Sequence, residues 1–345
     1  MHKEKIKIFL GGYLNYTNAQ NLNCLALAKY LDSNMFKTYA LSVYFSPKIN
    51  SQAIMFNCFY PFKISSMLGF LWGVLKCDVI YLPKHHSTPR FALILSNLLG
   101  KKTFTTIEAN MCDTRKERNM IRAFGSEDKL INYFSYFNNI FPITKYILDN
   151  SICGVHLKRK VLFLGVDIDN FVPLLKDNLQ NIVFIGSLVN GKGTHEFIQL
   201  ARVFNKLKFH LIGEGPLRKE LENISSKNVI FHGFLANDQL KNVLIDMDLH
   251  LLLSRNEGFP KVILETAASG IPSVVYSDYG AEEWFSNGEN GFVVDDIKEV
   301  IEIIKQIEND NILLSEISEK AINFSKLFNW KLIVKDWQKI IFNLR

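Results

Sequence analysis

Short apolar runs that alternate with helical segments constrain the fold of this chain more than any other feature. Runs rich in Ile, Val and Phe occur at 6–10, 38–45, 78–83, 102–108 and 138–144. A second series starts with "KVLFLGV" after residue 160 and continues at 181–187, 209–215, 228–234, 249–254 and 272–277. Strands that alternate with helices of ten or more residues build βαβ units around parallel sheets. Two such series therefore predict two doubly wound, Rossmann-like α/β domains, and a length of 345 residues agrees with two.

The polar stretch 167–180 is the predicted linker between these domains. We expect an N-terminal domain over 1–168 and a C-terminal domain over 175–327. The final segment, 328–345, carries Trp330, Trp337 and further apolar residues at helical spacing. Because no strand follows it, this helix must pack on a domain that is already built.

Charge is distributed unevenly along the chain. Residues 1–170 carry 21 Lys and Arg against 11 Asp and Glu, a net +10, whereas the remainder carries 19 against 23, a net −4. This asymmetry predicts an anionic partner for the first half, such as a membrane surface or a phosphorylated acceptor. No nucleic-acid motif accompanies the charge, so nucleic acid is not the expected partner.

Hydropathy and cysteine usage exclude several classes. No run of 18 apolar residues exists, so no membrane-spanning helix is expected. The apolar part of the N-terminal "MHKEKIKIFLGG" is too short for a signal peptide and indicates a first strand. The five cysteines are scattered and lack CxxC spacing, so neither a zinc site nor a disulfide framework is expected, and a reducing cytosol is the simple interpretation.

Three glycine-bearing turns follow successive strands of the second half. They contain Gly186 with Lys192, then Gly213 with Gly215, then Gly233 with Phe234. A glycine turn that leads into a helix presents free backbone N–H groups to an anion. Since ligands of parallel sheets bind outside the carboxyl ends of the strands, these turns predict one continuous binding rim.

"RNEGFPKVILE" (255–265) continues this rim and places Glu257 eight residues before Glu265. The pair is open to four interpretations: an acid/base pair, a metal site, a ligand grip or a solvated helix face. A helical rise of ~1.5 Å per residue would separate the carboxylates by about 12 Å. Glycosidase carboxylates lie about 5–9.5 Å apart, so a hydrolytic pair is disfavoured. Pro260 suits the first turn of a helix, which puts Glu257 in the preceding loop and Glu265 inside the helix. We therefore expect two grips on one long ligand.

Several motifs of the second half follow one another in a fixed order, which is more specific than any one of them alone. "GSLVNGKG", "LIGEGP", "VIFHGF", "SRNEGFPKVILETAASGIPSVV" and "NGENGFVV" occur in this order, and "FLGVDIDNF" (163–171) precedes them. Together they resemble the C-terminal half of family 4 glycosyltransferases. The resemblance implies the GT-B fold, with the last helix crossing back to the first domain, and retaining transfer from a nucleoside diphosphate sugar without a metal or other cofactor.

The resemblance also implies roles for individual residues. Glu257 would contact the donor sugar, Glu265 would accept hydrogen bonds from the ribose, and Lys192 would neutralise the leaving diphosphate. The implied donor site comprises Gly12, Gly186, Ser187, Lys192, Gly213, Gly215, Gly233, Phe234, Glu257, Gly258, Phe259, Pro260, Lys261, Val262 and Glu265.

Ser187 departs from the family pattern, which usually has an arginine at this position. The phosphate grip then rests on Lys192 alone, or on Arg255 or Lys261 as well.

The first half is the predicted acceptor side. Gly11–Gly12 resembles the family's N-terminal glycine loop beside the diphosphate. Asn15, Tyr16 and Asn18 follow it and are candidates for holding an acceptor, together with Arg115 and Arg118.

A histidine at a strand end of the first domain approaches the donor sugar in this family. Glu108 stands at the best-aligned position, while His85 and His86 follow the preceding strand. The assignment among these three stays open, and Glu108 and His85 are the catalytic candidates beside Glu257 and Lys192.

The segment 55–76 is dense in Phe, Met and Trp, and 114–122 carries a basic stripe. Two interpretations remain: a core helix with solvated charges, or peripheral contact with an anionic membrane.

The sequence thus predicts a glycosyltransferase that moves a sugar to a saccharide or lipid-linked acceptor in surface-polysaccharide or lipopolysaccharide assembly. A UDP-sugar is the favoured donor and a GDP-sugar the alternative. The expected location is the cytoplasm, with association to the inner face of the membrane as a variant. The rival interpretations are a sugar-nucleotide epimerase or phosphorylase of the same fold, or a binding subunit with a decayed site.

Overall fold

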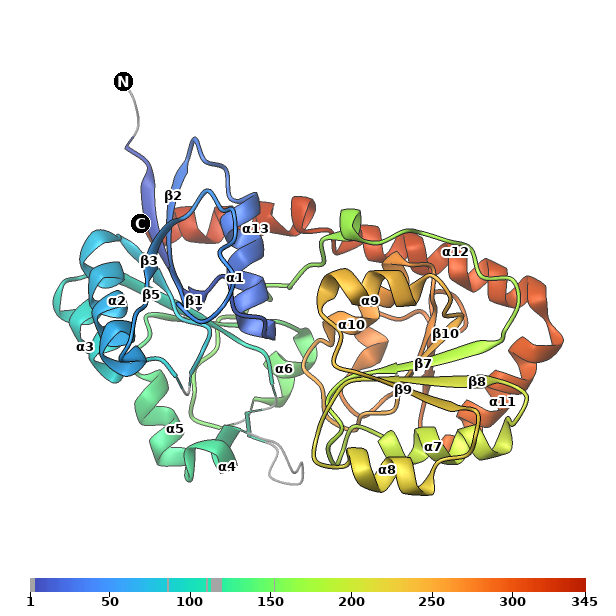
Figure 1. Cartoon of the computed structure of the whole chain (residues 1–345). Helices are drawn as coiled ribbons and strands as arrows, with labels where there is room; N and C mark the ends of the chain where they lie inside the picture. The colour runs from blue at the N-terminus through green and yellow to red at the C-terminus, as the bar shows by residue number, and fades with distance from the viewer. Residues whose placement is uncertain (1–3, 86, 110, 113–119, 152) are drawn as a thin grey trace. The chain divides into compact units, whose positions relative to one another are not determined.

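A computed structural model describes residues 4–345 except 86, 110, 113–119 and 152. The chain divides into two compact units, one of Met1–Gly165 with Trp330–Arg345 and one of Val166–Asn329 (Figure 1). The predicted boundaries at 168 and 328 lie close to these divisions. Among the described residues, no helix is long and apolar enough to cross a membrane.

The first unit contains a six-stranded parallel sheet with the order β3-β2-β1-β4-β5-β6. Its strands are β1 (Ile6–Tyr13), β2 (Phe36–Ser42), β3 (Ile54–Asn57), β4 (Val79–Tyr81), β5 (Lys102–Ile107) and β6 (Asn139–Pro142). Its helices are α1 (Ala19–Tyr30), α2 (Phe62–Lys76), α3 (Arg90–Leu98), α4 (Met120–Phe124), α5 (Glu127–Phe134), α6 (Lys145–Asn150) and α13 (Trp330–Leu344). Because the order reverses between β1 and β4, right-handed crossovers place α1 on one face and α2 and α3 on the other.

Helix α13 belongs to the first unit, as predicted for the final segment. Its Trp337 is fully buried, and the indole N–H donates to the carbonyl of Phe163 at 2.9 Å. The same ring meets Tyr81 of β4 edge-on, with 5.3 Å between ring centroids. Trp337 thus anchors α13 against the sheet of the first unit.

The second unit repeats the plan, with the strand order β12-β11-β10-β7-β8-β9. Its strands are β7 (Asn181–Ile185), β8 (Lys208–Ile212), β9 (Val229–Gly233), β10 (Leu249–Leu252), β11 (Ser273–Tyr276) and β12 (Phe292–Val294). Its helices are α7 (Thr194–Val203), α8 (Arg218–Ile224), α9 (Asn237–Leu244), α10 (Lys261–Ala268), α11 (Ile297–Asn309) and α12 (Asn311–Leu327), with short 3-10 turns η1 (Ile168–Asn170) and η2 (Ala281–Glu283). The two doubly wound domains that the sequence predicted are confirmed.

One predicted strand is absent and two observed strands were not predicted. "KVLFLGV" after residue 160 forms no strand; Leu162 and Leu164 are buried in an extended segment, which explains their apolar character. Conversely, β3 and β12 were not predicted as strands, because each is only three or four residues long.

The segment 167–180 is not a linker but lies along the second unit. The backbone N–H of Lys176 donates to the Ser318 hydroxyl at 3.0 Å, and its ammonium donates to the carbonyl of Ile245 at 2.7 Å. Leu179 joins the core of the unit. The polar composition of the segment suggested a solvated linker, but its backbone and two of its side chains are bound to the second unit.

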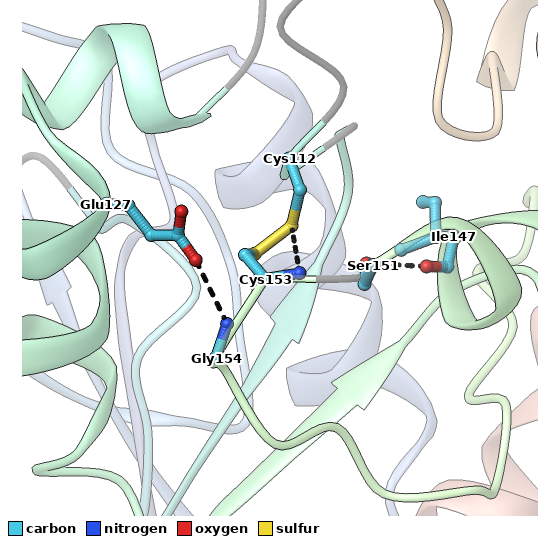
Figure 2. Close-up of a disulfide and its surroundings, with 6 residues drawn as sticks. All are labelled: Cys112, Glu127, Ile147, Ser151, Cys153 and Gly154. Carbon is cyan, nitrogen blue, oxygen red and sulfur yellow. Dashed lines mark hydrogen bonds between the residues drawn. A yellow bond between two sulfur atoms is a disulfide. The ribbon is translucent and has the colours of Figure 1, made fainter.

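The cysteine prediction was wrong for two residues. Cys112, after β5, and Cys153, after α6, form a disulfide, and the Cys153 N–H also approaches the Cys112 sulfur at 3.2 Å (Figure 2). The neighbouring Gly154 N–H donates to Glu127 at the start of α5 at 3.3 Å. The other three cysteines are buried and remain as thiols. A separation of 41 residues makes such a pairing invisible to spacing rules.

Buried histidine makes the second unit sensitive to acid. His250 of β10 is fully buried, and burial lowers its pKa to about 3, from an ordinary value near 6.5. Below pH ~6.5 the imidazole of His250 therefore binds a proton in the unfolded chain but stays neutral in the folded chain. The free energy of unfolding is highest above that pH and falls on acidification. We expect about 3 kcal/mol of destabilisation by pH 4 from this group. Urea titrations across this range should show a shallower pH dependence for His250→Asn than for the wild type; equal slopes would contradict the assignment.

Candidate active site

The second sheet reverses its strand order between β7 and β10, which pair in parallel. Ligands of doubly wound sheets bind at such a switch point. Lys192 lies in the loop after β7 and Glu257 in the loop after β10, and their side chains form an ion pair. Both are largely shielded from solvent, with exposed side-chain fractions of 22% and 12%. The structure therefore brings the two predicted catalytic residues of the second unit into direct contact.

The backbone explains why these residues meet. The N–H of Arg255 donates to the carbonyl of Gly191 at 3.3 Å, which ties the two loops together. Gly193 has a φ of +73°, and a Cβ there would overlap the Leu253 carbonyl. The loop that carries Lys192 thus rests on the end of β10, and this close approach requires glycine.

Helix α10 starts as predicted. Pro260 caps it, Lys261 is its first residue and Glu265 lies within it. Glu265 is half-buried; burial raises the pKa of its carboxyl group, and Lys261 opposes that shift. Gly258 is buried in the loop before the helix, while Val262 is half-buried. A helix N-terminus between two carboxylates suits a long ligand with an anionic middle.

Phe259 plays a different part from its neighbours. Its ring is buried against Trp284, with centroids 4.7 Å apart, and against Phe328 at 5.1 Å. The side chain therefore anchors the loop in the core, which leaves the backbone as the group available to a ligand.

The glycine turns after β7, β8 and β9 are joined by backbone hydrogen bonds. The Gly186 N–H donates to Ile212 at 3.0 Å, and the Gly213 N–H to Gly233 at 2.8 Å. A Cβ on Gly213 would overlap the Gly186 carbonyl, and one on Gly215 would overlap that of Leu188. These glycines thus permit close packing of adjacent turns, a role that the anion-binding interpretation alone did not include.

The rim also presents two exposed side chains. Ser187 is exposed at the first turn. Phe234, after β9, is 66% exposed. Such a ring offers a stacking surface for a planar or sugar ligand.

Arg255 does not extend the rim's positive charge. Its guanidinium donates to Asp278 at 2.7 Å and to the Asp295 carbonyl at 3.0 Å, and lies 3.7 Å from the Tyr276 ring centroid. An arginine held by a carboxylate, a carbonyl and an aromatic face fixes the loop after β10. Of the two alternatives to Lys192 alone, Lys261 is the better placed.

The first sheet has its own switch point, between β1 and β4. Gly11 and Gly12 are not a loop after the strand but a bulge within β1, where the register with β2 shifts. A Cβ on Gly12 would lie 2.8 Å from the Cys24 sulfur, so α1 packs tightly on the bulge.

Lys84 follows β4 at this edge and was missed by the sequence analysis. Its ammonium lies 4.9 Å from the Tyr13 ring centroid, and burial lowers its pKa. The only hint in the sequence was its place directly after the strand, ahead of two more conspicuous histidines.

Glu108 and His85 have different surroundings. Glu108 accepts hydrogen bonds from the Asn23 amide at 2.9 Å and from the Gln20 amide at 3.5 Å. His85 bonds Thr105 at 2.8 Å and packs edge-on against Phe134 within the first unit. His86 lies outside the described residues.

The acceptor candidates also differ in their surroundings: two are held by backbone contacts and one is exposed. Asn15 exchanges hydrogen bonds with the backbone of Val43 and so fastens the segment after β2. Asn18 is the N-cap of α1, accepting from the Asn21 N–H. Tyr16 is exposed and meets Phe45 edge-on. Arg115 and Arg118 lie outside the described residues.

Within the described ranges, no group of three or more His, Cys, Asp or Glu side chains is arranged to hold a metal ion.

Comparison with known proteins relates the second unit to one family. The family described as "Glycosyl transferases group 1" matches residues 166–324. An uncharacterized 41.2 kDa protein in the cps region of Klebsiella pneumoniae is 26% identical over 257 residues, which cover 66% of this chain and 69% of the relative. The capsular polysaccharide biosynthesis glycosyltransferase CapM of Staphylococcus aureus is 29% identical over 188 residues, 50% of this chain and 49% of the relative. The chain thus aligns with about half to two thirds of the length of these relatives.

Solved structures match over nearly the whole chain. Anabaena HepE in complex with UDP-glucose has a TM-score of 0.76 at 18% identity, over 98% of this chain and all of that one. Sucrose-phosphate synthase from Thermosynechococcus elongatus has a TM-score of 0.78 at 12% identity, over 99% of both chains. At such identities the likeness shows the fold, which is GT-B. Residues 166–324, within the second unit, are thus similar to the group 1 glycosyl transferases.

Proposed function

We propose that this protein is a retaining, metal-independent glycosyltransferase that moves a sugar from a UDP-sugar to a saccharide or lipid-linked acceptor in surface-polysaccharide assembly. The observation that carries the proposal is the Lys192–Glu257 ion pair at the switch point of the second sheet, just ahead of α10. The capsule and lipopolysaccharide enzymes among its relatives support the context, and the neighbour that binds UDP-glucose supports the donor.

The chemistry follows from the charges at this site. A departing nucleoside diphosphate develops negative charge, and a preorganised ammonium together with a helix N-terminus stabilises that charge where it forms. Lys192 supplies the ammonium and α10 the N–H groups. Glu257 holds the ammonium in position and accepts from the sugar hydroxyls, while Glu265 accepts from the ribose.

The first unit would bind the acceptor. Glu108 is the better candidate for the role that the resemblance gives to a histidine, because three side chains, those of Asn23, Gln20 and Thr106, orient its carboxylate. His85 is instead engaged with Thr105 and an aromatic cluster. Lys84 would bind an anionic group on the acceptor.

A ligand panel tests the donor assignment. UDP-, GDP- and ADP-sugars should be compared for their shift of the melting temperature, since a ligand that binds the folded state stabilises it by mass action. We expect the largest shift from a UDP-sugar. Consumption of the donor at full rate without any acceptor would indicate an epimerase or hydrolase instead, and an inverted anomer in the product would contradict retention.

Glu265→Gln tests the ribose contact. We expect roughly 10–150-fold weaker UDP binding, because a hydrogen bond to a charged acceptor contributes about 1.5–3 kcal/mol. Calorimetry with UDP and with its 2′-deoxy and 3′-deoxy analogues provides the control. The wild type should discriminate against at least one analogue, and the variant should bind all three alike. Unchanged discrimination in the variant would remove Glu265 from the ribose.

A further inference from the structure

Helix α2 carries an apolar outward face. Ile64, Met67, Leu68 and Leu75 are all exposed, and at 3.6 residues per turn they fall within about 100° of arc. Tyr60, just before the helix, is 80% exposed. The opposite side of α2 packs on β1, β2 and β3 and is buried. The sequence analysis left two interpretations of this segment, and the helix has both characters: one face is core and the other is apolar but uncovered.

Helix α3 extends this surface. It packs beside α2 (Figure 1), and it exposes Ile94 and Leu98, the latter by 78%. We call the exposed side chains of α2 and α3, with the tyrosine before them, the α2–α3 face: Tyr60, Ile64, Met67, Leu68, Leu75, Ile94 and Leu98. Single exposed apolar residues are ordinary, but a contiguous group on neighbouring helices marks an interaction site.

Charge identifies the partner. Residues 33–107, which include both helices, carry eight Lys and Arg and a single acidic residue, Asp78. Asp78 is half-buried and accepts a hydrogen bond from the Lys7 backbone at 3.2 Å. On α2, Lys63 and Lys76 are exposed on either side of the apolar arc. An apolar centre flanked by cations is complementary to a bilayer that carries anionic headgroups.

A second copy of the chain fits this face less well. A twofold contact would set the face against itself and bring like charges together, since no acidic side chain of 33–107 other than Asp78 exists to pair with them. The apolar arc favours self-contact, but its cationic margins oppose it.

We propose that the α2–α3 face docks the first unit on an anionic lipid bilayer, with Tyr60, Met67 and Leu75 entering the headgroup region and Lys63 and Lys76 meeting lipid phosphates. This goes beyond the proposed transfer reaction and does not require it. It replaces the stripe at 114–122 as the carrier of membrane contact with residues that the structure describes. A lipid-linked acceptor would then be presented at the same unit that binds it.

Vesicle binding by the full chain tests the proposal. The wild type should co-sediment with vesicles of phosphatidylcholine mixed with phosphatidylglycerol and should remain unbound with phosphatidylcholine alone. Lys63→Gln/Lys76→Gln should weaken partitioning roughly 30-fold, because each lysine near an anionic surface contributes ~1 kcal/mol. Met67→Glu/Leu75→Glu should abolish it.

Matched controls come from exposed residues of the second unit. Lys206→Gln/Lys227→Gln and Val203→Glu change the same chemistry elsewhere and should bind as the wild type does. Circular dichroism and UDP binding, measured without vesicles, establish that the variants are folded and that their donor site is intact. A failure of the membrane proposal is then distinguished from a failure of the proposed transfer reaction. Equal binding to neutral vesicles, or unchanged binding by both α2 variants, would overturn the proposal. So would a dimer in lipid-free solution that Met67→Glu/Leu75→Glu dissociates, which would assign the face to a second copy.

Discussion

Replacing Lys192 with Met is expected to lower kcat for sugar transfer about 10²–10³-fold, the range seen when one donor to a developing anion is removed. The substitution keeps the length of the side chain and removes its charge. Since the loop that carries Lys192 is held by the Gly191–Arg255 hydrogen bond and does not depend on the ammonium, the free energy of unfolding should change little. Initial rates at saturating donor, with denaturation of the same preparation, measure both quantities.

The ion pair sharpens this prediction. Glu257→Gln should also lower kcat strongly, but Lys192→Met/Glu257→Gln should lose much less than the product of the two single effects. Residues in direct contact act as a unit, and their effects on a shared step are not additive. Lys206→Met removes an exposed lysine from the same unit and should leave kcat unchanged. Full additivity of Lys192 and Glu257 would mean that the contact has no part in the reaction, and an unaffected Lys192→Met would remove the lysine from the mechanism.

The sequence predicted the parts of the site whose chemistry is local. Pro260 at the start of α10, Glu257 before it and Glu265 within it follow from helix rules and spacing alone. The two doubly wound domains follow from the alternation of strands and helices. Each strand, helix start and turn behind these predictions is recognised from a window of about ten residues.

What the sequence did not predict depends on contacts between distant segments. Lys192 and Glu257 are 65 residues apart, and only the pairing of β7 with β10 brings their loops together. Arg255 looked equally suitable as a phosphate ligand until Asp278 and Tyr276 were seen to hold it. His85 and Lys84 are adjacent in sequence, yet one is tied to Thr105 and Phe134 and the other lies over Tyr13 at the switch point.

The glycines of the rim illustrate how one residue serves two requirements. Spacing marked them as an anion-binding device, but Gly213 and Gly215 also let the turns after β7 and β8 approach until backbone touches backbone. The packing role can be tested by itself, since it acts on stability without any ligand.

Gly213→Ala is therefore expected to destabilise the second unit by about 3–5 kcal/mol. Gly213 has a φ of +141°, which L residues rarely adopt, and a Cβ would overlap the Gly186 carbonyl, so strain and steric overlap add. Gly100→Ala isolates the backbone strain, because the φ of Gly100 is +64° but no atom lies within 4 Å of a Cβ there. We expect it to lower the free energy of unfolding of the first unit by about 1–2 kcal/mol. Gly186→Ala meets only Phe184 at 3.4 Å, an ordinary contact, and should cost least.

Two units need not unfold together, so the measurement must resolve them. Hydrogen exchange followed on peptides of β7–β9 and, separately, of β1 and β4–β6 does so. For Gly213→Ala, protection should fall in the first set and persist in the second. Loss of protection in both sets would mean that the units unfold as one. A Gly213→Ala chain as protected as Gly186→Ala would show that the turns can move apart at little cost, and the glycines would then be explained by the ligand rather than by the fold.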